Sequence, residues 1–194
     1  ELNKYKEEVL KTAKDSMSDN DIAYIEEDLR SPCTQEIALF RAFAEIVEKA
    51  DNEIVVIDTA PTGHTLLLLD ATESYHKEIQ RSQGNVPESV KKLLPRLRNK
   101  NETEVVIVTL PETTPVFEAL RLQEDLKRAG INNKWWIINS SLLLTETDNV
   151  FLKAKAQTEI TWINKVKEFA EDNVVVVPWQ GAEIKEENIR NLIN

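Results

Sequence analysis

The stretch TEVVIVTLPETTPVFEALRLQEDLKRAGINNKWWIINSS, residues 103–141, is the part of the sequence that best indicates the fold class. Its two ends, residues 103–110 and 134–141, are apolar runs rich in β-branched and aromatic side chains, which predict buried strands. Between them, residues 113–130 predict a helix that has Pro115 in its first turn and stops at Gly130. A strand, a helix and a second apolar strand are typical of a parallel sheet.

The same alternation continues on both sides of this stretch. Residues 150–170 predict a long helix, and NVVVVPW, residues 173–179, predicts a further strand. Upstream, EIVVID, residues 53–58, predicts a short buried strand. The pattern therefore favours an α/β fold in which helices cover both faces of a parallel sheet.

The remainder of the chain reads as helical. Amphipathic helices are predicted over 4–17 and 21–30, followed by a long helix after Pro32 and further helices over 66–80 and 85–99, the last interrupted by Pro95. A short polar helix is expected at the end. We interpret 1–194 as a single partial domain, with a helical region at 1–50 and a sheet-forming core at 51–194. The core contains a helical or mobile segment at about 71–103.

Composition narrows the function classes. The 194 residues are 41% hydrophobic and 30% charged, which suits one globular domain. The net charge of -10 argues against nucleic acid as a partner, since phosphate binding needs excess Lys and Arg. No apolar run reaches about 18 residues, so a soluble, cytoplasmic protein is expected. The opening ELNKYKEEVLK has no Met and resembles the middle of a helix, so we expect a piece of a longer protein.

Ligands of open parallel sheets gather beyond the carboxyl ends of the strands. Here those ends carry Asp58, residues 109–112, Asn139 and Pro178. An Asp after an apolar run has the form of a Walker B acid, which holds Mg²⁺ directly or through water. The alternative is an Asp that caps the next helix or turn, and the pattern alone does not favour either interpretation.

A glycine-rich phosphate loop of the G-x-x-x-x-G-K-[ST] kind is absent from this sequence, because none of the four glycines precedes a Lys. Either the chain belongs to no nucleotide enzyme, or the phosphate loop lies in a segment outside it.

Four segments carry a family resemblance: DTAPTGHTLLLLDAT at 58–72, RSPCTQEIALFRAF at 30–43, VTLPETTPVFEA at 108–119 and WWIINSSL at 135–142. Together they resemble the arsenical pump-driving ATPase family over roughly residues 28–180. The resemblance implies a partial P-loop NTPase fold of the deviant Walker A (SIMIBI) type, lacking its N-terminal phosphate-loop strand. The single cysteine looks more like the second ATPase unit of such proteins than the first.

The resemblance also implies residue roles and cofactors, namely ATP and Mg²⁺. Asp58 resembles the catalytic Walker B acid, and residues 59–65 resemble the switch that links nucleotide state to a metalloid site. Asn139 resembles an asparagine that reads adenine, and Pro178 resembles a residue packed beside the base. Glu112 matches a glutamate that contacts nucleotide from the facing unit.

Cys33 is the only cysteine of the chain, and a lone cysteine is most often a small buried side chain. Ser31 as N-cap and Pro32 as first helical residue would place Cys33 in a first turn, where the helix dipole favours the thiolate. Thiolates suit As(III) and Sb(III). The resemblance implies a metalloid site formed by Ser31, Cys33 and His64 with ligands of a second unit, although capping alone explains Ser31.

The resemblance implies a fragment of a metalloid-stimulated ATPase that drives arsenite and antimonite efflux, with the isolated chain inactive. The implied partners are a second ATPase unit in the same chain or a homodimer, a membrane arsenite permease and a metalloid chaperone, at the inner face of the membrane. One alternative is an ATPase that targets tail-anchored membrane proteins, which needs a Met-rich groove, whereas this chain has one Met. The other alternative is a non-catalytic regulatory domain of the same fold.

Overall fold

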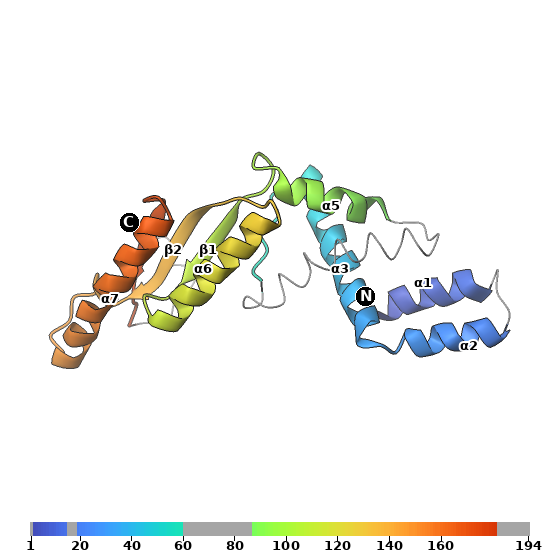
Figure 1. Ribbon diagram of the computed structural model, residues 1–194, viewed down its shortest axis with the longest axis horizontal. Helices are drawn as coiled ribbons and strands as arrows, with labels where there is room; N and C mark the ends of the chain where they lie inside the picture. The colour runs from blue at the N-terminus through green and yellow to red at the C-terminus, as the bar shows by residue number, and fades with distance from the viewer. Residues whose placement is uncertain (1, 15–18, 60–86, 182–194) are drawn as a thin grey trace. The chain divides into compact units, whose positions relative to one another are not determined.

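The computed structural model describes residues 2–14, 19–59 and 87–181 (Figure 1). The chain divides into two compact units, Glu1–Leu97 and Arg98–Asn194, and each is described by itself. The interpretation of residues 1–194 as one partial ATPase domain stays a prediction.

The first unit is helical in its described part. It contains α1 (Leu2–Lys14), α2 (Asp19–Asp28), α3 (Pro32–Glu48), the short 3-10 helix η1 (Lys49–Asp51) and α5 (Glu88–Arg98). Helix α1 packs against α2 and α3 (Figure 1). Ion pairs Lys4–Glu45 at 3.8 Å and Arg41–Glu8 at 3.6 Å join α1 to α3.

The core of this unit lies between α3 and α5. Phe40, Ala44 and Val47 recur at helical spacing on α3 and pack against Val90 and Leu93 of α5. Helix α5 also continues through Pro95 to its end at Arg98, so the predicted interruption is not seen. Because only three residues follow Pro95, the backbone hydrogen bond that proline removes lies in the last turns of the helix.

The predicted strand over 53–58 is wrong for this structure. Residues 54–59 have no regular secondary structure, and Ile54 and Val56 are 94% and 88% exposed. A strand requires a neighbour for its backbone hydrogen bonds, and the described strands pair only with one another. Apolar β-branched sequence provides strand propensity but not the missing partner.

The second unit contains the sheet. Its elements are β1 (Val105–Thr109), α6 (Thr113–Arg128), β2 (Asn133–Ser141), α7 (Val150–Phe169) and β3 (Val174–Pro178). The three strands pair in the order β1-β2-β3, and both pairings are parallel. This arrangement confirms a parallel sheet flanked by helices, and the three strands lie within one or two residues of their predicted bounds.

One face of this sheet is covered by described helices. Helix α6 packs on β1 and α7 on β2, and the two helices contact each other (Figure 1). Ile107, Trp136 and Ile138 are buried, whereas their neighbours Val106 and Trp135 are 43% and 40% exposed. Helices on both faces were expected from the apolar strands, and in the described residues only one face has them.

No helix in the described part of the chain combines the length and apolar character needed to cross a bilayer.

Candidate functional site

The carboxyl ends of β1, β2 and β3 meet at one edge of the sheet, because the strands are parallel neighbours. The chain leaves this edge at residues 110–112, 139–141 and 178–179. The structure therefore brings Glu112, Asn139 and Pro178 to one edge, as the sequence predicts. The roles of these residues in nucleotide binding stay predictions.

The exit of β2 has an irregular backbone. Ser140 has a φ of 56°, an uncommon value for a residue other than glycine, and the pairing with β3 shifts register between Ile138 and Ser141. The exposed side chain of Asn139 accepts a hydrogen bond from Ser140 N through Oδ1, at 3.0 Å. Its Nδ2 donates to no described residue, and so can donate to a ligand.

The exits of β2 and β3 are joined by hydrogen bonds. Trp179 N donates to the carbonyl oxygen of Ser141 at 2.9 Å. The Thr145 hydroxyl lies 3.1 Å from the same carbonyl and 3.2 Å from that of Trp179. These bonds hold Ser141, Thr145 and Trp179 together as one small assembly at the edge.

A buried carboxylate supports this assembly from α7. Glu159 is 2% exposed and accepts hydrogen bonds from Ser141 Oγ at 2.8 Å and from Leu142 N and Leu143 N at 3.2 Å each. A buried carboxylate is costly unless it is hydrogen bonded, and three donors meet that need here. Glu159 was not among the site residues predicted from the sequence.

The signal that could have found Glu159 is its position on α7. It falls on the helical face that carries the buried residues Ala156, Ile163 and Val166. An acid at an apolar-face position predicts either a buried partner or a functional group.

The exit of β1 leads into α6 through Glu112. Glu112 occupies the N-cap position of α6, but its side chain does not cap the helix. Instead Glu112 Oε1 pairs with Lys155 Nζ of α7 at 2.9 Å, with both side chains about half exposed. The hydrogen bond to Glu112 and then its charge raise the pKa of Lys155; burial opposes the shift and the charge of Glu159 adds to it.

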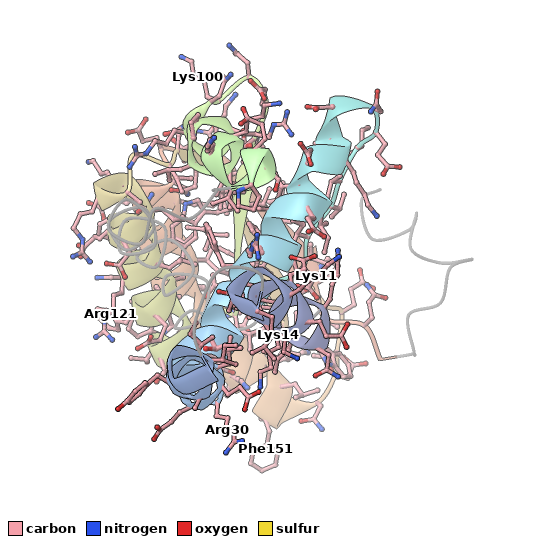
Figure 2. The ribbon with its side chains drawn as sticks, turned by 90° about the vertical axis from the view of Figure 1, so that its right-hand side faces the viewer. Lys11, Lys14, Arg30, Lys100, Arg121 and Phe151 are labelled. Atoms are coloured by element: carbon pink, nitrogen blue, oxygen red, sulfur yellow. The ribbon has the colours of Figure 1, made fainter. Side chains whose placement is uncertain are left out.

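A cavity of about 300 Å³ lies at this edge. Its apolar lining residues are Leu110, Pro111, Leu142, Leu152 and Trp179. Its polar lining residues are Glu112, Ser140, Lys155 and Glu159. Leu152 lines it, whereas the neighbouring Phe151 points outward from the first turn of α7 (Figure 2). Apolar walls with a few polar groups are typical of a pocket for an organic ligand. Asn139 and Pro178 lie beside it, each next to a lining residue.

The remaining predicted site residues belong to the first unit. Asp58 is exposed and follows no strand. Ser31 is the N-cap of α3, since its side chain accepts from Thr34 N at 3.4 Å, and Pro32 is the first helical residue. Cys33 is thus in the first turn of α3, as predicted. The His64 prediction, like the expected helix over 66–80, lies outside the described residues.

No cluster of three or more His, Cys, Asp or Glu side chains suited to a metal occurs within 2–14, 19–59 and 87–181. The fit of Asp58 to Mg²⁺ is therefore partial: one exposed carboxylate suits an ion that takes its other ligands from phosphates and water. The metalloid assignment to Ser31, Cys33 and His64 stays a prediction.

Comparisons with known proteins agree on one family. A family model described as anion-transporting ATPase matches residues 1–88 and 71–192. An arsenical pump-driving ATPase of Acidiphilium multivorum is 46% identical over 92% of this chain and 30% of its own length. A putative arsenical pump-driving ATPase of Halobacterium salinarum is 27% identical over 93% of this chain and 30% of its own length.

Another relative is the ATPase asna-1 of Caenorhabditis elegans, which is 28% identical over 79% of this chain and 56% of its own length. The chain thus spans about 30% of the length of the arsenical pump-driving relatives from Acidiphilium and Halobacterium.

Proposed function

The chain belongs to the anion-transporting ATPase family, and from this premise we propose that it forms the later part of one ATPase unit and supplies the base-binding side of its ATP site. The family has the P-loop NTPase fold, in which nucleotides bind beyond the carboxyl ends of parallel strands. The observation that carries the proposal is the cavity at that edge of β1–β3, beside Asn139 and Pro178.

Recognition of adenine fits the chemistry of this edge. Asn139 has an amide nitrogen that no described residue uses, and an amide can read a purine edge by hydrogen bonds. Pro178 offers an apolar surface beside the base, and the neighbouring Trp179 is 44% exposed at the rim of the cavity. Glu112, at the same edge, contacts nucleotide held by the facing unit.

Asp58 has the role of the Walker B acid in this proposal. Mg²⁺ supplies charge stabilisation of the phosphoryl group when it is bound, and the Asp58 carboxylate orients the ion and the attacking water. The 194 residues contain no G-x-x-x-x-G-K-[ST] loop that could supply a phosphate-binding Lys. By itself the 194-residue chain is therefore inactive.

The transported substrate is arsenite or antimonite. The 46% identity to a protein named arsenical pump-driving ATPase supports this assignment. The N-cap geometry of Ser31 supports it independently, because it places Cys33 where a helix dipole favours the thiolate that As(III) and Sb(III) prefer. Metalloid held between two units by Cys33, His64 and Ser31 favours the closed state, and a membrane permease is the partner.

The test measures ATP hydrolysis by the full-length protein with and without antimonite. We expect antimonite to stimulate hydrolysis, sulfate to leave it unchanged, and Cys33→Ser to abolish the stimulation. Hydrolysis that ignores antimonite, combined with capture of a hydrophobic transmembrane peptide, would instead support the targeting function. Absence of hydrolysis with an intact phosphate loop would support a regulatory domain.

A further inference from the structure

We propose that Glu159 is a positioning residue for base recognition: it holds the loop after β2 so that Asn139 faces the ligand beside Pro178 and Trp179. This inference rests on the proposed base site. Its carboxylate oxygens accept hydrogen bonds from the loop, and Glu159 acts through the backbone of that loop.

Glu159 accepts three hydrogen bonds from the loop after β2. Leu142 N and Leu143 N lie in the turn that follows β2, outside any helix or strand ladder, and they donate to the two carboxylate oxygens of Glu159. Ser141 Oγ is the third donor, at 2.8 Å. Ser141 and Glu159 are 0% and 2% exposed, so water does not compete for these bonds.

The residue immediately before these donors, Ser140, has a strained backbone. Ser140 has a φ of 56°, a left-handed conformation that is unfavourable for a residue with a Cβ. Such a conformation persists only when its surroundings fix it. Glu159 fixes the three residues that follow Ser140, whereas Asn139 directly precedes it. Release of the loop would let Ser140 relax and turn Asn139.

Ser141 connects the two sides of the proposed base site. Ser141 is bound by Glu159 through its hydroxyl and by Trp179 N through its carbonyl, at 2.8 Å and 2.9 Å. Glu159 therefore sets the position of Asn139 on one side and of Trp179 on the other. Because α7 is anchored in the core through Ile163 and Val166, the carboxylate is a rigid support.

Substitution Glu159→Gln tests this role without changing the size of the side chain. One carboxylate oxygen becomes an NH₂ donor, which faces donors already present in the loop. The Ser141 hydroxyl can rotate and accept from it, but a backbone N–H cannot, so one loop amide loses its acceptor. The matched control is Glu168→Gln, at an exposed position of the same helix.

The experiment titrates the 194-residue chain with adenosine and, separately, guanosine, and follows NMR shifts to obtain the ratio of the two dissociation constants. Nucleosides are the probes because they need no phosphate loop. We expect wild type and E168Q to prefer adenosine over guanosine by the same ratio of dissociation constants. In E159Q this ratio should be roughly fivefold smaller, because one hydrogen bond is lost. Thermal unfolding curves show whether each variant is folded.

A second variant covers the case in which E159Q fails to fold. Ser141→Ala removes one of the three contacts and leaves both backbone amides bonded, so it should reduce the preference by roughly twofold. A wild-type chain without preference for adenosine would refute the proposed base site itself. If E159Q folds and keeps the full wild-type preference for adenosine, the role of Glu159 is refuted and the base site is not. If E159Q does not fold, the same result for S141A refutes that role.

Discussion

The Lys155–Glu112 pair links the start of α6 to the first turns of α7 at the candidate site. Both side chains are about half exposed, so solvent screens the pair and its contribution to stability is about 0.5 kcal/mol. Glu112 is also the residue proposed to contact nucleotide from a facing unit. The pair therefore holds Glu112 at the edge without burying it.

Stability should depend on pH through this pair. Glu112 raises the pKa of Lys155 above its ordinary 10.5 in the folded chain. The pair's contribution is therefore present in full at pH values below the unfolded pKa, and is lost as pH rises through the folded pKa. A double-mutant cycle with Glu112→Gln and Lys155→Met, measured by urea unfolding, should give a coupling of about 0.5 kcal/mol at pH 7.

The same cycle at alkaline pH is the decisive control. Coupling should vanish once Lys155 is deprotonated, while each single variant still unfolds cooperatively. Coupling that stayed constant from pH 7 to well above 10.5 would show that the two residues interact through packing and not through charge.

Residue-level prediction succeeded where chain position determines location. Glu112, Asn139 and Pro178 follow apolar runs, and parallel pairing alone brings such residues to one edge. Glu159 was not predicted because its partners are backbone amides of a turn 16 and 17 residues away in sequence. A helical pattern shows that Glu159 is on the buried face but not which donors meet it there.

The C-terminal end of α6 shows how sequence determines where a helix stops. Gly130 has a φ of 75° and donates to Lys127 O at 3.1 Å, and Ile131 N donates to Leu126 O at 2.9 Å. These two bonds form a Schellman motif, and both Leu126 and Ile131 are 4% exposed. The predicted stop at Gly130 is confirmed, and the turn aims the chain into β2.

Substitution Gly130→Ala should destabilise the chain by about 1 kcal/mol or more, since the left-handed conformation disfavours a Cβ. The new Cβ would also lie 3.3 Å from Arg98 Nε, which donates to Ala129 O at 2.7 Å. Urea unfolding measures the change. The matched control is Gly181→Ala, where among the described residues a Cβ meets only Trp179 carbons at 3.5 Å or more and the effect should stay within about 0.5 kcal/mol. Equal effects at the two glycines would contradict the argument from φ.

Sequence pattern predicted the helices and strands correctly where the segments they pack against lie nearby in the chain. Three segments that follow one another in the chain, β1, α6 and β2, pack together, and the observed bounds of each lie close to the predicted ones. Residues 53–58 have the same apolar character as β1 but no paired neighbour among the described strands, and they remain without regular structure. Strand formation depends on a partner that single-sequence periodicity does not identify.

The two compact units of the chain have separate tasks in the proposed function. The first holds Cys33 in α3 and the acid Asp58, and the second holds the edge that is proposed to bind the base. The chain covers only 30% of the length of its arsenical pump-driving relatives from Acidiphilium and Halobacterium. In the proposed function, metalloid binding takes ligands from a second unit as well as from this chain.

The 194-residue chain should bind arsenite only weakly. It contains one Cys and two His, and a single thiolate gives a soft trivalent ion one preferred ligand where a tight site offers several. The measurement follows the rate at which a disulfide reagent modifies Cys33 in the presence of arsenite, with Cys33→Ser as the blank. At arsenite equimolar with protein the rate should be unchanged, and protection should require a large excess. Full protection at one equivalent would show that this chain forms a complete metalloid site, which would refute a site shared with a second unit.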